Sequence, residues 1–264
     1  MAPVENMQLP PETPLNRRPR AVIVGASSGI GAALARRLAQ EGMSLALLAR
    51  REAALEDLCA EINQQAGETR ALAYPHDVTQ SESIPPLFER LLADLGGIDL
   101  FVYCAGFQYS PAIDEYDFAQ DRQTLEVNLL AAVAWLGLVA NLFQRMRHGS
   151  IVGITSLAGD RGRVANPPYS SSKAGLDAYL ESLRNRLTRH GVHVLTVKPG
   201  FVDTEILKNA ASKTFGVISP TRAADGIWMA LRKKHQLVYL PWWWRLIMLA
   251  IRFTPSFIFR RLSF

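Results

Sequence analysis

Cysteine is scarce in this sequence: Cys59 and Cys104 are the two cysteines among its 264 residues. Two cysteines cannot crosslink a domain of this size, and the sequence has no cluster of cysteine and histidine with metal-ligand spacing. We therefore expect neither a disulfide scaffold nor a metal site. A reducing compartment, the cytoplasm, is the simplest expectation. No apolar run follows Met1, which argues against a secretory signal.

Acidic residues are missing from the C-terminal region. Residues 230–264 hold seven of the 29 Lys and Arg residues and none of the 24 Asp and Glu residues, so the rest of the chain has 22 bases and 24 acids. The body is therefore nearly neutral, and the pI of about 9.4 originates in the C-terminal region. A nearly neutral body argues against a nucleic-acid partner, whose recognition needs a basic face.

The remaining pattern is that of an α/β protein. From Arg20 onward, short apolar runs alternate with helical stretches. The predicted strands are 21–24, 45–49, 70–74, 98–103, 150–154, 192–197 and 237–240. The predicted helices follow the first glycine-rich turn through Glu41 and then span 52–65, 85–95, 121–147 and 169–190. This alternation predicts a Rossmann-type doubly wound parallel sheet in a single domain, with helices on both faces and right-handed crossovers.

A glycine-rich turn lies between the first predicted strand and its helix. Its sequence is Gly25-Ala26-Ser27-Ser28-Gly29-Ile30-Gly31. Glycine allows positive φ and a close approach of the backbone to a ligand, and the helix that follows directs free N–H groups at a pyrophosphate. Three glycines in a loop are a weak signal, but the position between strand and helix favours dinucleotide binding. We expect the cofactor to touch Gly25, Ser27, Ser28, Gly29, Ile30 and Gly31.

The end of the second predicted strand bears on the choice of cofactor. It reads Ala49-Arg50-Arg51, without the acid that commonly holds the ribose 2′-hydroxyl of NAD. We expect Arg50 to pair with a 2′-phosphate, with help from Arg51 or Ser27, and therefore NADP(H) rather than NAD(H). The alternative is that both arginines are solvated residues at a helix start. Asp77-Val78, after the third strand, are candidates for the adenine edge, although a lone Asp in a loop is usually a turn or cap residue.

Proton-transfer chemistry is suggested by Tyr169 and Lys173, which lie four residues apart and so on one helix face. A phenol has a pKa of about 10, and a nearby ammonium lowers it. We expect Lys173 to supply that charge. Ser156, directly after a strand, is placed to polarise a carbonyl, and Asn128 to order a water behind Lys173. By itself the Tyr/Lys spacing is close to chance, and a tyrosine at a helix start is more often a packing residue.

Taken together and in this order, the motifs resemble the single-domain short-chain dehydrogenases/reductases over about residues 20–240. The matching motifs are Gly25 to Gly31, Asp77-Val78, Cys104-Ala105-Gly106, Asn128, Ile154-Thr155-Ser156, Tyr169-Ser170-Ser171-Ser172-Lys173 and Lys198-Pro199-Gly200-Phe201-Val202-Asp203-Thr204. Two residues depart from the family pattern. Val24 replaces a common threonine, and Cys104 replaces the usual asparagine, which is expected to loosen the turn that follows the fourth strand.

The resemblance implies hydride transfer between a nicotinamide cofactor and a carbonyl or alcohol carbon. Tyr169 would be the general acid in reduction and the base in oxidation. Lys173 would bind the nicotinamide ribose and lower the tyrosine pKa. Ser156 would hold the substrate oxygen, and Asn128 would complete a proton relay. The implied cofactor contacts, besides Tyr169 and Lys173, include Ala105, Gly106, Pro199, Gly200, Val202 and Thr204. The family also implies a homodimer or homotetramer formed through the helices 121–147 and 169–190.

The substrate pocket should draw on the segments 107–118, 157–168 and 206–219, the last as a mobile lid. The apolar candidates for its lining are Phe107, Tyr109, Val164, Phe201, Ile206, Leu207 and Phe215. Arg161 and Arg163 are placed to meet an acidic group, although loop arginines are usually solvated. Because apolar residues outnumber the arginines among these candidates, we expect an apolar ketone or aldehyde as substrate.

The C-terminal residues 241–264 combine apolar and basic character. The run Pro241-Trp242-Trp243-Trp244-Arg245 is followed by aliphatic residues, Arg252 and Phe253. It is shorter than the ~20 apolar residues that span a bilayer, and tryptophan favours the headgroup region. We expect a tail that lies in a membrane surface. The alternatives are that it packs on the pocket entrance or on a partner subunit, or that its tryptophans form the outer wall of the pocket.

The sequence therefore predicts three segments: a flexible Pro-rich lead-in over 1–19, a dinucleotide-binding catalytic domain over 20–240 and the tail over 241–264. It predicts an NADP(H)-dependent oxidoreductase acting on a small carbonyl or alcohol. A non-catalytic nucleotide-sensing protein, or a membrane-surface scaffold on the same fold, stays open as the alternative.

Overall fold

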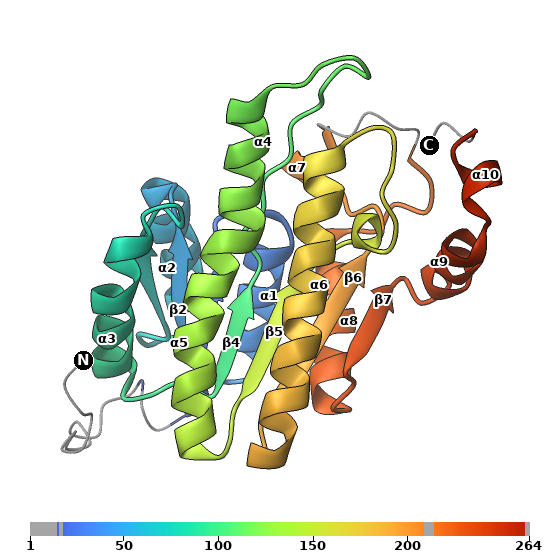
Figure 1. Ribbon diagram of the computed structural model, residues 1–264. Coiled ribbons are helices and arrows are strands. Elements are labelled where there is room, and N and C mark those ends of the chain that lie inside the picture. Colours follow the sequence, from blue (N-terminus) through green and yellow to red (C-terminus); the bar gives the residue numbers. More distant parts are fainter. Residues whose placement is uncertain (1–14, 16–17, 209–213, 262–264) are drawn as a thin grey trace.

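One parallel sheet of seven strands organises the chain. The computed structural model describes residue 15 and residues 18–208 and 214–261, so the predicted lead-in lies almost entirely outside the described residues. The strand order is β3-β2-β1-β4-β5-β6-β7 (Figure 1). The strands are β1 (Arg20–Val24), β2 (Ser44–Ala49), β3 (Ala71–Pro75), β4 (Leu100–Tyr103), β5 (Ser150–Ile154), β6 (His193–Pro199) and β7 (Leu237–Leu240).

Helices cover both faces of this sheet, which confirms the predicted Rossmann-type architecture. One face carries α1 (Gly29–Gln40), α2 (Glu52–Ala66) and α8 (Pro220–Arg232). The other carries α3 (Ile84–Leu95), the continuous helix of α4 (Phe118–Leu125), a π-turn (Glu126–Leu130) and α5 (Ala131–Met146), and α6 (Pro167–Leu187). The short α7 (Glu205–Lys208) follows β6, and α9 (Trp244–Phe253) and α10 (Ser256–Phe259) follow β7.

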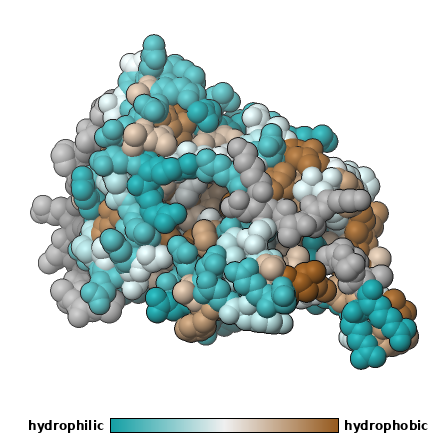
Figure 2. Space-filling model, turned by 90° about the horizontal axis from the view of Figure 1, so that it is seen from above, coloured by the Kyte–Doolittle hydropathy of each residue, from teal (hydrophilic) through white to brown (hydrophobic). Residues whose placement is uncertain are grey.

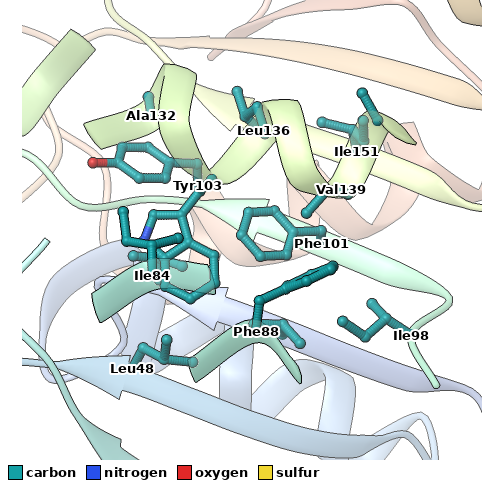
Figure 3. Packing of buried hydrophobic residues seen from close by; sticks show 14 of the residues in the cluster. Leu48, Ile84, Phe88, Ile98, Phe101, Tyr103, Ala132, Leu136, Val139 and Ile151 are labelled. Carbon is teal, nitrogen blue, oxygen red and sulfur yellow. The ribbon is translucent and has the colours of Figure 1, made fainter. Parts of the chain in front are cut away.

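The strands read as unbroken apolar runs because both of their faces are buried. In β1, Val22 and Val24 pack under α5, while Ala21 and Ile23 pack under α1. Figure 3 shows the first of these two cores, where Phe101 of β4 lies between Phe88 of α3 and the α5 side chains. Alternate side chains of each strand therefore pack against the helix layers on the two faces of the sheet. The strand ends are left to build a site.

One crossover has the opposite hand to the prediction. Strands β4, β5, β6 and β7 follow one another in one direction across the sheet. Helices α5 and α6 connect them over one face, whereas α8 connects β6 to β7 over the other. The strands are parallel, so the β6–α8–β7 connection is left-handed. The handedness rule assumes a short strand–helix connection, and here a long one intervenes that begins with residues 200–208 at the carboxyl edge of the sheet.

In the described part of the chain one helix, Phe118–Met146, is long and apolar enough to cross a membrane by length and composition. One side of this helix, which includes Trp135, Val139 and Phe143, is buried against the sheet, while Leu130 of the same helix is exposed. The helix is therefore accounted for as a core helix of this domain.

Candidate active site

The glycine-rich loop after β1 is built so tightly that only glycine fits at two of its positions. Gly25 has a φ of +92°, and a Cβ there would overlap the backbone of Ala105 after β4. A Cβ on Gly31 would overlap the carbonyl of Gly25. The N-cap Ser28 makes no side-chain hydrogen bond to the first turn of α1. The loop therefore leaves helix N–H groups open toward the cavity that it lines, as a phosphate cradle requires.

Asn128 lies in the π-turn that joins α4 to α5, a local widening of the helix that is frequent at functional sites. The buried Tyr103 hydroxyl donates a 2.6 Å hydrogen bond to the carbonyl of Val127, one residue before Asn128. The Asn128 side chain is then fixed by Phe107: its Oδ1 accepts from the Phe107 N–H at 2.7 Å and its Nδ2 donates to the Phe107 carbonyl at 2.9 Å. The Asn128 side-chain amide thus connects the segment after β4 to the helix that continues as α5.

Tyr169 and Lys173 come from the first two turns of α6, whose start is set by Asn166-Pro167-Pro168. The Asn166 side chain accepts a hydrogen bond from the Tyr169 N–H at 3.0 Å, and proline suits the first helical position. The Asn166 amide also donates to the Tyr109 carbonyl at 2.6 Å. This cap fixes the register of the helix, and therefore which residue faces the end of β5.

Ser156 and Tyr169 meet beyond the end of β5. Burial raises the pKa of Tyr169, while a hydrogen bond with the Ser156 hydroxyl and the positive charge of Arg163 act in the lowering direction. Arg163 is thus a cation that lowers this pKa and that was not placed beside the phenol from the sequence. The Lys173 ammonium lies 5.7 Å from the centre of the Tyr169 ring, and its expected effect on the phenol stays a prediction.

Lys173 is enclosed beneath the cavity. Its Nζ donates to the carbonyl of Ile154 at 3.2 Å, and a Cβ placed on Gly106 would lie 3.6 Å from both Lys173 Nζ and Asn128 Oδ1. Burial lowers the pKa of Lys173 to about 8, against the raising effects of Cys104 and Asp177. The two side chains assigned to the proton relay therefore face the same point, Gly106.

Cys104 does not disturb the turn that it occupies. Its N–H donates to the carbonyl of Val24 at 2.8 Å, and its sulfur accepts from the Gly31 N–H. Burial raises the pKa of the thiol to about 12, so it stays protonated at neutral pH. The thiol thus makes a tie to the glycine-rich loop, and the expected loosening of the turn is not seen.

A buried ionic cluster lies directly behind the Tyr169–Lys173 face. Lys198, from the end of β6, forms ion pairs with Asp160 and, at 2.7 Å, with Asp177. The Tyr239 hydroxyl donates to Asp160 at 3.1 Å. Asp177 lies one helical turn after Lys173, so the cluster links the ammonium of the site to the strand that leads into Pro199 and Gly200.

The two arginines after β2 differ in position. Arg51 donates to the Ser28 hydroxyl at 2.5 Å and to the Ser27 hydroxyl at 3.3 Å, and pairs with Glu205 of α7 at 2.9 Å. Arg50 is exposed, with Asp77 4.0 Å away. Arg51 rather than Arg50 thus lies against the glycine-rich loop.

Asp77 behaves as a turn residue. Its Oδ1 accepts from both the N–H and the hydroxyl of Thr79, at 3.0 and 2.8 Å. Its neighbours Val78 and His76 line the main cavity, whereas Asp77 lines a separate shallow depression together with Arg50. The Asp77 side chain therefore stabilises its own turn through Thr79.

A single cavity of about 450 Å³ joins these parts at the carboxyl edge of the sheet. Figure 2 looks down on this edge and shows the surface hollowed near its centre. Of the predicted residues, those that line the cavity are Gly25, Ser27, Ser28, Gly29, Ile30, Arg50, Arg51, Val78, Ala105, Gly106, Ser156, Tyr169, Lys173, Pro199, Gly200, Val202 and Thr204. Asn128 reaches it through Phe107 and Gly106.

The apolar part of the cavity is smaller than predicted. Phe107, Phe201, Ile206 and Leu207 line it. The other three candidates lie elsewhere, each for a local reason. The Tyr109 hydroxyl donates to Asp121, Val164 is exposed, and Phe215 stacks on Trp243. Part of the predicted lid, residues 209–213, lies outside the described residues.

Trp243 and Trp244 of the tail pack behind the cavity wall and do not line the cavity, whereas Trp242 is exposed. Trp244 is buried, and its indole lies so close to Gly200 that a Cβ there would overlap it. It meets Phe201 edge-on, with ring centres 5.8 Å apart. The tail therefore supports the residues predicted to seat the nicotinamide.

Three residues of the site were missed or given another role in the sequence analysis. Arg163 was a candidate to meet an acidic group of the substrate or a solvated loop arginine, whereas it lines the cavity and acts on Tyr169. Asp177 and Asn166 were not considered. Asn166 had a readable signal, an N-cap residue directly before two prolines. Asp177 had none, because its partner Lys198 is brought near only by the sheet.

The cavity fits a dinucleotide by observations of the protein itself. The glycine-rich loop packs so closely on itself and on Ala105 that Gly25 and Gly31 have no room for a Cβ, and its helix start lines the cavity without a side-chain cap. An arginine with two serine hydroxyls lies at one side of this loop. Among the described residues, no group of three or more His, Cys, Asp and Glu side chains is placed to hold a metal ion.

Comparison with known proteins agrees with this arrangement. A sequence profile of the family described as short chain dehydrogenase matches residues 19–214. An uncharacterized oxidoreductase of Streptomyces coelicolor is 35% identical over 251 residues, which are 92% of this chain and 96% of that protein. A ketoacyl reductase of Nostoc sp. is 30% identical over 217 residues, 81% of this chain and 75% of that protein.

A solved structure gives the same picture. The short-chain dehydrogenase from Sphingobium yanoikuyae in complex with NADPH is similar with a TM-score of 0.78 and 26% identity, covering 84% of this chain and 88% of that one. The profile match runs from the glycine-rich loop through the segment after β6, so it spans the whole region that builds the cavity.

Proposed function

The chain belongs to the short-chain dehydrogenase family, and we propose that it is an NADP(H)-dependent reductase of an apolar ketone or aldehyde. One observation carries the proposal. Gly25, Gly29 and Ile30 of the glycine-rich loop and the pair Tyr169 and Lys173 line the same cavity. Residues that would hold the phosphates of a dinucleotide and residues that would transfer a proton thus share one cavity.

Each catalytic side chain is assigned a role from its surroundings. Tyr169 gives its phenolic proton to the substrate oxygen, and Ser156, hydrogen-bonded to it, holds that oxygen. Lys173 binds the nicotinamide ribose and, when charged, favours the phenolate left behind. The reduced nicotinamide supplies the hydride when bound. Positioning of the reactants and general acid catalysis together lower the barrier.

Asn128 is assigned to the return of the proton. Its Oδ1 and Lys173 Nζ both face Gly106, so a water between them can return a proton to the neutral Lys173 amine after the ammonium has given one up. Because the Asn128 amide is held by both backbone atoms of Phe107, its orientation is fixed whether or not a ligand is bound.

The preference for NADP(H) is proposed from Arg51. Its guanidinium, next to Ser27 and Ser28, presents a planar donor set of the kind that binds phosphate. No acid ends β2, where one would favour the 2′-hydroxyl of NAD. The Sphingobium relative was solved with NADPH, which supports the same preference.

The proposed substrate is mainly apolar because Phe107, Phe201, Ile206 and Leu207 line the same cavity as Tyr169. Arg163 adds one positive charge to this wall. We assign it to the tuning of Tyr169, and an acidic group on the substrate is the alternative that a carbonyl panel would reveal.

We also propose that α5 and α6, which lie side by side on one face (Figure 1), form the interface of a homodimer or homotetramer. No third layer covers their outer faces in the described chain, and Leu130 at the start of α5 is exposed. Size-exclusion chromatography with light scattering tests this: a monomer at micromolar concentration contradicts it.

The experiment for the function is a panel of ketones and aldehydes of increasing chain length, followed by cofactor oxidation at 340 nm with NADPH and, in parallel, with NADH. We expect turnover with NADPH, higher kcat/KM for longer apolar substrates, and loss of at least about a hundredfold in Tyr169→Phe. Equal or better rates with NADH would contradict the proposal that Arg51 selects NADPH. No turnover of any carbonyl by a protein that binds NADPH would support the nucleotide-sensing alternative.

A further inference from the structure

Helix α9 has a buried inner face and an exposed outer face. On the inner face Trp244 and Met248 are buried against Leu157, the residue after Ser156. On the outer face Leu246, Leu249 and Phe253 are 60%, 54% and 75% exposed. Their spacing of three and four residues places them in one stripe along the helix. A single exposed leucine is ordinary, but a stripe of them is a feature of an interaction surface.

The apolar stripe continues beyond the helix at both ends. Trp242, before α9, is 70% exposed, and Phe257 and Ile258 of α10 are exposed as well. Both short helices project from one side of the molecule, next to β7 (Figure 1). The surface is therefore extended and convex, which suits a broad flat partner.

Positive charge flanks this stripe. Arg245 and Arg252 are exposed and seven residues apart, so they lie on one side of α9, and Arg260 and Arg261 are exposed after α10. Within the described residues none of these four arginines has a carboxylate within ion-pair distance, and residues 230–264 hold no acid at all. The charges are therefore available to an anionic partner.

We propose that the outer face of α9 and α10 docks on the surface of an anionic lipid bilayer. Exposed Trp, Leu and Phe next to unpaired arginines are the composition of a helix that lies in the headgroup region. At ten residues α9 is too short to span the hydrocarbon layer. A second copy docked symmetrically on this face would bring arginines against arginines, with no acid in the tail to pair with them.

The inner face connects the docked surface to the site. Arg161 donates to the carbonyls of Ile251 and Thr254 at the C-terminal end of α9, at 2.5 and 2.6 Å, and its guanidinium lies 3.8 Å over the Phe259 ring. Arg161 belongs to the same loop as Leu157, which lines the cavity. The bilayer would thus lie next to the wall through which an apolar substrate enters; this consequence rests on the proposed function, whereas docking itself does not.

The test is co-sedimentation of the full chain with vesicles of phosphatidylcholine alone or with phosphatidylglycerol at about one third. We expect binding to the anionic vesicles, weakened by high salt because the charges are exposed. Leu249→Glu with Phe253→Glu, and separately Arg245→Gln with Arg252→Gln, should each lower the partition coefficient by about tenfold or more.

Matched controls use exposed residues away from the tail. Met229→Glu on α8 controls for a new acid on an apolar position, and Arg189→Gln with Arg222→Gln, after α6 and on α8, controls for the loss of two charges. Both should bind vesicles like the unmodified chain. Unchanged melting temperature and unchanged NADPH binding show that each variant is folded.

Two results would overturn the proposal: no difference between anionic vesicles and a vesicle-free control, or an equal loss of binding in the control variants. Self-association without lipid that the α9 substitutions abolish would overturn it too, since it would identify a second copy as the occupant. Sedimentation does not depend on turnover. A chain that docks but reduces no carbonyl would therefore contradict the proposed function alone.

Discussion

Arg163 shows how a single side chain sets the chemistry of this site. It lines the cavity, its positive charge favours the phenolate of Tyr169, and burial lowers its own pKa. Its hydrogen-bond partner is the sulfur of Met248, 3.7 Å from Nη2. Among the described residues Arg163 forms no ion pair, although Asp160 acts on it from a longer distance. The charge of Arg163 therefore lowers the pKa of the Tyr169 phenol, whereas burial raises it and favours the protonated form.

Replacement of Arg163 by Met should raise the pKa of Tyr169, because a charge that stabilises the phenolate is lost. Reduction needs the protonated phenol and fails as pH rises through this pKa, so the alkaline limb should move up by roughly one pH unit. Oxidation of the alcohol needs the phenolate, so the acidic limb of the pH–rate profile for oxidation should also move to higher pH. The measurement is kcat against pH in both directions.

Arg222→Met, an exposed arginine on α8, is the control for that experiment and should leave both limbs in place. An unchanged profile in Arg163→Met would show that the guanidinium does not act on the phenol.

Asp177 is a positioning residue for the charge of Lys173. The pKa of Lys173 is about 8 because burial lowers it while Asp177 raises it. In Asp177→Asn the pKa should fall further, so the ammonium loses its proton at lower pH. The affinity for NADPH should then decline at a pH where the unmodified chain still binds, as fluorescence titrations at a series of pH values would measure.

Asp160→Asn is the matched control, since Asp160 shares the Lys198 cluster but does not act on Lys173. If both variants shift the pH dependence of NADPH binding alike, the effect comes from Lys198 and the assignment to Lys173 is wrong.

At the scale of elements, the site is assembled by three connections that cross the carboxyl edge of the sheet. The loop after β1 supplies the cradle, the π-turn between α4 and α5 supplies Asn128, and α7 after β6 covers the cradle from above. Arg51 ties the first to the third through Glu205. Because this ion pair is exposed, it contributes little stability and can yield to a competing phosphate.

Glu205→Gln should therefore strengthen NADPH binding by a few fold, since the 2′-phosphate no longer competes with a carboxylate for Arg51. NADH lacks this phosphate, and its affinity should change little. Arg51→Gln should have the opposite effect on NADPH and again spare NADH. Isothermal titration with both cofactors measures the difference. A gain for NADH equal to that for NADPH would mean that the substitution only loosens α7.

At the scale of the whole molecule, the sequence was sufficient for the sheet and for most of the cavity. Doubly buried strands read as apolar runs, and the glycine loop, Ser156, Tyr169 and Lys173 sit at strand ends or helix starts that local patterns predict. Their convergence follows from the parallel sheet, which gathers the carboxyl ends of its strands at one edge.

The features that were missed depend on contacts between distant segments. The left-handed β6–α8–β7 crossover departs from a rule that holds for short connections. The π-turn that holds Asn128 is stabilised by Tyr103, whose hydroxyl binds the carbonyl of Val127, 24 residues later along the chain. Arg163 acts on Tyr169 because the loop after β5 is supported by α9, and no pattern within that loop indicates this contact.

The central claim is that the cradle and the phenol serve one reaction in one cavity. The most direct measurement is the fate of deuterium from NADPH deuterated at C4 of the nicotinamide, followed by mass spectrometry of the alcohol formed from an apolar ketone. With the label on the transferred face, the account predicts one deuterium at the carbinol carbon with the unmodified chain and almost no labelled product with Tyr169→Phe. Alcohol formed without deuterium from either face, or equal labelling by Tyr169→Phe, would contradict it.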